Sequence, residues 1–210
     1  MLCIEGTTLD SRGPDLAVSL NVMTHFAEAR LLIAEGNESK ASTVLENLAS
    51  RYPNQLALPN FREISNEVQV LRGVLLADSG RWEEARSFLE SATAPSGWGG
   101  FLNFYRGRSY YETSDFAKAK QWFCEALKFK MIPKREAWTR YMLGRVHYHF
   151  SDFSAAKPEF EKTLRIADSE FAAKMKVLEW FESTTSALDS LAQPGAAHKA
   201  RSSPRGSMPN

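Results

Sequence analysis

Apolar residues recur along most of this chain at the three- and four-residue spacing that marks amphipathic helices. Phe104, Gly107 and Tyr110 share one stripe of a predicted helix, because every third or fourth residue returns to the same helical face. Ser114 and Asp115 then interrupt the pattern, and Asp115 has the residue type that caps the start of a following helix. The stretch therefore predicts two helices joined by a tight turn.

The second of these helices carries Ala119, Phe123 and Ala126 on its apolar face. Gly107 on the first helix and Ala119 on the second are small enough to let the two backbones approach each other closely. A glycine inside a helix costs about 1 kcal/mol relative to alanine. We therefore expect Gly107 to lie in tight contact with the partner helix, with large aromatic side chains beside it.

This arrangement recurs along the chain. Gly73 precedes Gly107 by 34 residues, and Gly144 follows it by 37 because residues 131–135 lengthen one junction. A weaker copy near the N-terminus has Ala29 where the others have glycine. The pattern predicts four helix–turn–helix units, at about residues 22–55, 61–96, 100–133 and 137–168.

This register resembles the tetratricopeptide repeat (TPR), a helix–turn–helix unit of about 34 residues with small, aromatic and alanine positions at these offsets. The resemblance covers about residues 22–168. It implies an all-α fold, a right-handed superhelical α-solenoid of TPR-like helix pairs. The fourth unit departs from the pattern at Thr163 and at Pro158, and because proline disrupts a helix interior we expect a late start or a kink there.

The last unit of a repeat array exposes an apolar face that a further helix must cover. Residues 169–191 form an amphipathic segment, which we interpret as a C-terminal capping helix that completes a repeat domain over residues 14–191. The same helix could instead mediate self-association or bind a partner. Residues 1–13 are expected to be a flexible N-terminus, and residues 192–210 a disordered basic tail.

The charge balance gives little support for nucleic-acid binding. The whole chain has a net charge of +1, and its last eighteen residues contain Lys199, Arg201 and Arg205 without any acid. The rest of the chain is therefore mildly acidic, whereas phosphate binding needs a clear positive stripe.

Cysteine usage and hydropathy favour a cytoplasmic protein. Cys3 and Cys124 are the two cysteines and lie far apart, so they do not indicate a disulfide framework. The N-terminus lacks the cationic start and apolar run of a signal peptide. No apolar run approaching the roughly 18 residues of a membrane span is evident, so no membrane partner is expected.

Residues that could carry catalysis or bind a metal do not form a recognisable set. His147 and His149 are two residues apart on a predicted helix and point to different faces, so they cannot chelate one ion together. Cys124 lies beside aromatic residues and is interpreted as a packed thiol. We therefore expect neither enzymatic activity nor a cofactor or metal.

The resemblance also implies a binding surface. In the TPR family the first helix of each unit lines a concave groove, and the residue after the glycine position points into it. These residues here are Arg30, Val74, Arg108 and Arg145. The aromatic residues predicted around them are Phe101, Phe104, Tyr111, Trp138, Tyr141 and Tyr148.

Guanidinium groups bind carboxylates through paired hydrogen bonds, and aromatic rings supply apolar contact area. The groove therefore favours a protein–protein interaction scaffold that binds a peptide segment, acidic or C-terminal. Three alternatives remain. The arginines could pair with local acids such as Glu112, the repeats could bind nucleic acid, or the chain could be a structural subunit of a larger assembly.

Overall fold

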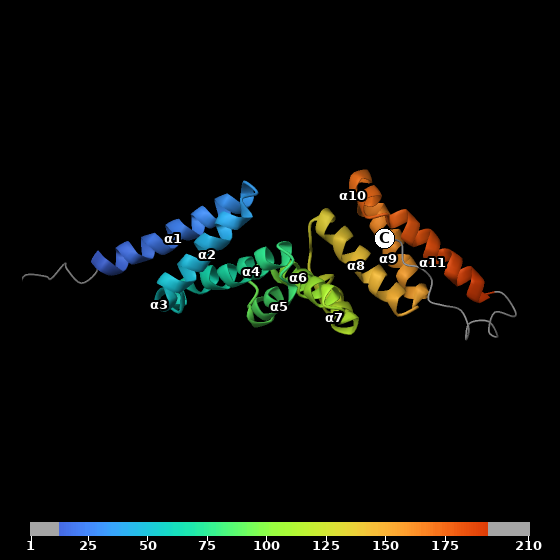
Figure 1. Ribbon diagram of the computed structural model, residues 1–210, viewed down its shortest axis with the longest axis horizontal. Helices are drawn as coiled ribbons and strands as arrows, with labels where there is room; N and C mark the ends of the chain where they lie inside the picture. Colours follow the sequence, from blue (N-terminus) through green and yellow to red (C-terminus); the bar gives the residue numbers. More distant parts are fainter. Residues whose placement is uncertain (1–12, 193–210) are drawn as a thin grey trace, which may run out of the picture. The chain divides into compact units, whose positions relative to one another are not determined.

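The computed structural model describes residues 13–192, and all regular secondary structure within that range is helical (Figure 1). These residues divide into two compact units at the boundary between Ser96 and Gly97, whereas the sequence predicts one repeat domain. The expected flexible N-terminus (1–13) and basic tail (192–210) lie outside the described range except at their inner ends, where Gly13 begins α1 and Ala192 ends α11, so both of these residues are helical.

The first unit contains five α-helices and one short 3₁₀ helix: α1 Gly13–Ala34, α2 Glu38–Arg51, α3 Pro53–Leu56, η1 Pro59–Phe61, α4 Arg62–Asp78 and α5 Trp82–Ser91. Helix α1 packs against α2, α2 contacts α4, and α4 pairs with α5. The short helices α3 and η1 lie at the junction between the first two predicted repeat units, and each begins at a proline, which suits a first helical turn.

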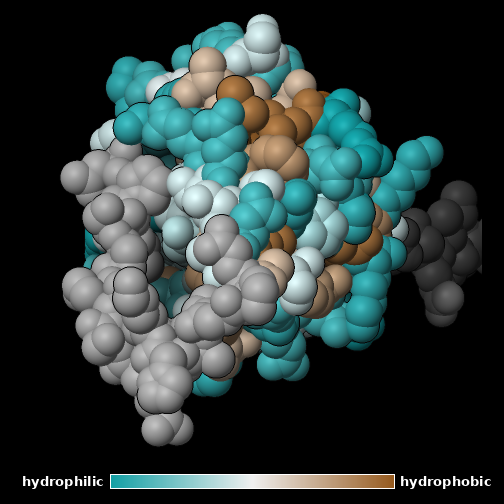
Figure 2. Space-filling view, turned by 90° about the vertical axis from the view of Figure 1, so that its right-hand side faces the viewer, coloured by the Kyte–Doolittle hydropathy of each residue, from teal (hydrophilic) through white to brown (hydrophobic). Residues whose placement is uncertain are grey.

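The second unit contains six helices: α6 Gly99–Glu112, α7 Phe116–Ala126, α8 Pro133–His149, α9 Phe153–Ile166, α10 Ser169–Lys174 and α11 Val177–Ala192. Helix α6 pairs with α7 and α8 with α9, while α7 also packs against α8 and α11 against α9 (Figure 1). The side of this unit shown in Figure 2 is largely hydrophilic, with hydrophobic residues gathered in patches.

The glycine of each well-matched repeat lies against a large side chain of the partner helix, as predicted for Gly107. A Cβ atom added to Gly107 would lie 2.6 Å from Cδ1 of Phe123, and one added to Gly144 would lie 2.8 Å from Cε1 of Phe160. Gly73 in the first unit meets a leucine side chain at 2.7 Å. Real Cβ contacts are not this short, so the close helix pairing requires glycine.

Each helix pair turns through one residue in the left-handed region. These residues are Gly36 and Gly80 in the first unit and Ser114 and Ser151 in the second, with φ between 59° and 80°. Asp115, predicted as an N-cap, accepts a hydrogen bond of 3.2 Å from the backbone N–H three residues later. The predicted turn chemistry is therefore confirmed at this position.

Two expectations for the C-terminal region differ from the structure. The predicted capping segment is not one helix, because α10 ends at Lys174 and α11 begins at Val177, with Lys176 at a φ of 51° between them. Of the late start or kink expected for the fourth unit's second helix, the late start is wrong, because α9 begins at Phe153 and includes Pro158. The kink stays a prediction. Trp180 of α11 stacks on Phe160 of α9 with 6.0 Å between ring centroids, which covers the last helix pair.

Helix α1 contradicts the expectation that no apolar run approaches the length of a membrane span. Residues 16–34 are long and apolar enough to meet the criterion for a membrane-spanning helix, with a mean hydropathy of 1.2 and 17% of the residues buried. The same criterion is met by core helices of soluble proteins and by signal sequences, so it does not assign a membrane location. The helix buries Val22, Phe26 and Ala29, and it leaves Leu16 and Leu20 exposed.

Candidate functional site

Arg30, the predicted groove residue of the first unit, contacts a local acid. Its Nε lies 3.6 Å from Oε1 of Glu67 on α4, and its guanidinium lies 5.9 Å from the ring centroid of Phe26. Burial raises the pKa of Glu67, Arg30 opposes that rise, and Glu63 adds to it. Oε1 of Glu67 is buried without a hydrogen bond, so the ion pair compensates this carboxylate incompletely.

The predicted groove residues of the second unit separate into two clusters. The first cluster centres on Arg145 of α8, whose guanidinium carbon lies 5.2 Å from the ring centroid of Tyr111, 5.6 Å from that of Tyr141 and 5.1 Å from that of Trp180. Tyr148 joins the same cluster, with its ring 5.2 Å from that of Trp180. Arg145 is therefore surrounded by aromatic rings from α6, α8 and α11.

The Arg145 cluster is more enclosed than an open groove would be. Burial raises the pKa of Tyr111 and of Tyr141, and the charge of Arg145 opposes both increases. Nε of Arg145 is buried and has no hydrogen-bond partner. Trp180, which sequence reasoning placed only in a capping helix, closes this cluster from α11. The arrangement holds three helices together through cation–π contacts.

The second cluster contains Phe104, Arg108 and Trp138. The guanidinium of Arg108 lies 5.8 Å from the Trp138 ring, and the Phe104 and Trp138 rings are 6.4 Å apart. Phe104 is only 4% exposed, so it forms a wall of the site. These three residues line a cavity of about 180 Å³ together with Tyr105, Ile132, Lys134 and Arg135.

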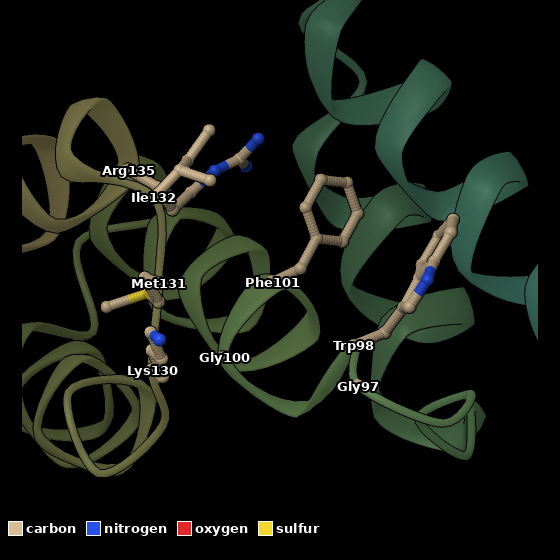
Figure 3. A pocket seen from close by; sticks show the side chains of 8 residues that line it. All are labelled: Gly97, Trp98, Gly100, Phe101, Lys130, Met131, Ile132 and Arg135. Carbon is tan, nitrogen blue, oxygen red and sulfur yellow. The ribbon is translucent and has the colours of Figure 1, made fainter.

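Arg135 contacts three rings of this cluster, although it is not among the groove residues predicted from the sequence. Its guanidinium carbon lies 4.4 Å from the ring centroid of Phe101, 5.3 Å from that of Phe104 and 5.6 Å from that of Tyr105. Figure 3 shows the Phe101 ring between Arg135 and Ile132 on one side and Trp98 on the other. Cation–π contacts with three rings therefore hold a positive charge at this point of the surface.

Arg135 also lines a second, adjoining cavity of about 270 Å³ (Figure 3). Its other lining residues are Gly97, Trp98, Gly100, Phe101, Lys130, Met131 and Ile132. The two cavities share Ile132 and Arg135. No acidic residue lines either cavity, and Lys130, Lys134 and Arg135 form none of the salt bridges found among residues 13–192. We call the cavity-lining residues Trp98, Phe101, Arg108, Lys130, Lys134 and Arg135 the Arg135 surface.

The Arg135 surface was missed because three of its cations lie on or beside the segment that joins two repeats. Lys130 follows α7, while Lys134 and Arg135 belong to the first turn of α8. A usable signal was the lengthened step between Gly107 and Gly144, since insertions in repeat proteins often map to one face.

Residues 13–192 contain no group of three or more His, Cys, Asp and Glu side chains that could hold a metal ion. Burial raises the pKa of the Cys124 thiol, which disfavours the reactive thiolate at neutral pH. Nδ1 of His147 lies 3.1 Å from a carboxylate oxygen of Asp152, and the same carboxylate caps α9. Cys124 is exposed, which differs from the packed thiol expected from the sequence. His147 and Asp152 are engaged at the N-terminus of α9.

Comparison with known proteins supports the fold. No family model and no curated protein matches this chain. Among solved structures, one described as "MamA RS-1 ArsTM double mutant" matches with 17% identity and a TM-score of 0.55, over 69% of this chain and 74% of that one. A crystal structure of MamA matches with 14% identity and a TM-score of 0.54, over 81% and 93%. The chain therefore has an all-α, TPR-like α-solenoid fold.

Proposed function

We propose that this protein is a non-catalytic interaction module that binds an acidic segment of a partner protein on the Arg135 surface. The observation that carries the proposal is the pair of adjoining cavities lined by aromatic rings and four cations without a carboxylate. Such a surface offers charge-assisted hydrogen bonds to Asp and Glu side chains or to a C-terminal carboxylate. Its rings supply apolar contact area for the side chains of an extended peptide.

The charge distribution agrees with an acidic ligand. Residues 97–192 contain fifteen lysines and arginines against twelve acids, whereas residues 13–96 contain seven against eleven. The positive excess is therefore confined to the unit that carries the Arg135 surface. Aromatic residues that alternate with cations also suit single-stranded nucleic acid, which is the competing ligand class.

A random dodecapeptide library displayed on phage provides a test that does not need a known partner. We expect selection against the whole chain to enrich peptides rich in Asp and Glu. Arg135→Gln should weaken a selected peptide about tenfold or more, because it removes a charged hydrogen bond worth roughly 1.5–3 kcal/mol. Arg165→Gln is the matched control, since Arg165 pairs with Glu161 on an exposed helix surface.

Three results would contradict the proposal: selected peptides without acidic enrichment, equal affinity for wild type and Arg135→Gln, or affinity unchanged between about 50 and 300 mM salt. Displacement of the peptide by a thymidine oligonucleotide, with tighter binding of the oligonucleotide, would favour the nucleic-acid alternative.

A further inference from the structure

A third cavity adjoins the Arg135 surface and has a different chemical character. It has a volume of about 390 Å³ and lies between the start of α8 and the junction of α9 with α10. Its apolar lining residues are Ile132, Pro133, Ala137, Ile166, Ala167 and Phe171. We call it the Phe171 cavity.

The polar groups at the Phe171 cavity do not change this apolar character. Lys134 is exposed and also lines the cavity of Arg108. The carboxylate of Asp168 accepts a hydrogen bond of 2.7 Å from the backbone N–H of Phe171, which caps α10. The remaining wall is hydrocarbon and suits an aliphatic or aromatic side chain.

Ile132 connects the three cavities. It lines each of them and is 66% exposed, although it is a large aliphatic residue immediately before α8. Ile132 and Lys134 both line the cavity of Arg108 and the Phe171 cavity, so a chain that lies along the cations reaches the Phe171 cavity beside these two residues. Burial of Ile132 under a ligand would remove its apolar surface from water, which favours binding.

We infer that the ligand of this surface is bipartite: a run of acidic residues on the Arg135 surface, and an apolar side chain at a fixed distance from it in the Phe171 cavity. This inference rests on the proposed function, because the acidic run sets the position of the apolar anchor. Charge complementarity favours a partner protein over the chain's own tail, since residues 193–210 contain cations and no acid.

The peptides selected from the phage library test the inference. We expect them to contain Leu, Ile, Met or Phe at a constant number of residues from their acids. Replacing that apolar residue by serine should weaken binding about tenfold or more, because a buried side chain of this size is worth that factor. Its replacement should have little effect in the variant Ala167→Phe, whose new ring fills the Phe171 cavity.

Ala173→Phe is the matched control, because Ala173 is exposed on α10 and does not line the cavity. Circular dichroism establishes that both variants fold. Acid-rich selected peptides without an apolar residue at constant spacing would overturn the inference and leave the proposed function intact. If replacing the apolar residue by serine weakened binding equally in wild type and in Ala167→Phe, that result would also overturn the inference and leave the proposed function intact. Selected peptides that lack acids and bind Arg135→Gln as tightly as wild type would overturn both proposals.

Discussion

The guanidinium of Arg135 at the start of α8 lies 4.4 Å from the ring centroid of Phe101 at the start of α6. The contact joins the N-terminal ends of α6 and α8, the first helices of two successive repeats. It holds a cation in a fixed place, since a ring constrains a guanidinium without neutralising it. On the proposed function, a carboxylate of the partner would meet a positive charge that the Phe101 ring already positions.

Ile132→Asp should raise the free energy of unfolding and weaken the binding of an acidic peptide. Ile132 is the N-cap residue of α8 and supplies no side-chain hydrogen bond there. Aspartate at an N-cap accepts a backbone hydrogen bond and should raise the free energy of unfolding by about 0.5–2 kcal/mol. The same charge would repel an acidic peptide and remove the apolar contact between the cavities.

Thermal melting and peptide titration measure the two effects. The isosteric control Ile132→Asn should stabilise α8 in the same way but weaken peptide binding less, because it adds no charge. Retention of wild-type affinity by Ile132→Asp would show that the ligand does not pass this residue.

Gly107→Leu should lower the free energy of unfolding by about 1–3 kcal/mol or more, because the added atoms overlap the ring of Phe123. Urea denaturation followed by tryptophan fluorescence would measure the loss. Ala117→Leu on the exposed side of α7 is the control and should change stability by less than about 0.5 kcal/mol. Equal midpoints for the two variants would contradict the tight helix contact.

Arg145→Gln should destabilise the second unit, since Arg145 contacts three rings on three helices. We expect a loss of about 1–2 kcal/mol, the range of a partly desolvated cation–π cluster. Thermal melting would measure the loss, and amide exchange in α11 would show where the unit loosens. Arg165→Gln serves again as an exposed control, and a melting temperature unchanged by Arg145→Gln would argue that this arginine is available to a ligand.

Glu67→Gln should stabilise the first unit most clearly near neutral pH. Burial raises the pKa of Glu67 in the folded chain, Arg30 opposes the rise and Glu63 adds to it, so the folded state binds this proton more tightly than the unfolded state. Stability therefore falls as pH rises through the window between the unfolded and folded pKa values, and it is recovered on acidification.

Glutamine cannot ionise, so the difference in unfolding free energy between Glu67→Gln and wild type should grow with pH across that window and then level off. Urea titrations between about pH 4 and pH 7 would show this trend. Glu83→Gln, at an exposed position paired with Arg86, is the comparison. A difference that does not vary with pH would exclude the raised pKa.

The sequence by itself determined the helix pairs and their register. Helical periodicity is local, and the constant offset from Gly107 to Phe123 and from Gly144 to Phe160 records one contact between the two helices of each pair. Helix ends were also readable, because caps such as Asp115 act within one turn. These features depend on residues close in the chain.

Only the tertiary structure decided which cations line a cavity and which are packed among aromatic rings. Arg108 and Arg145 follow equivalent glycines, yet Arg145 is enclosed because α11 brings Trp180 over it, while Arg108 lines an open cavity. Arg135 contacts Phe101 because the first turn of α8 packs beside α6. Side-chain exposure depends on contacts between elements that are distant in the chain, and a repeat pattern contains no information about those contacts.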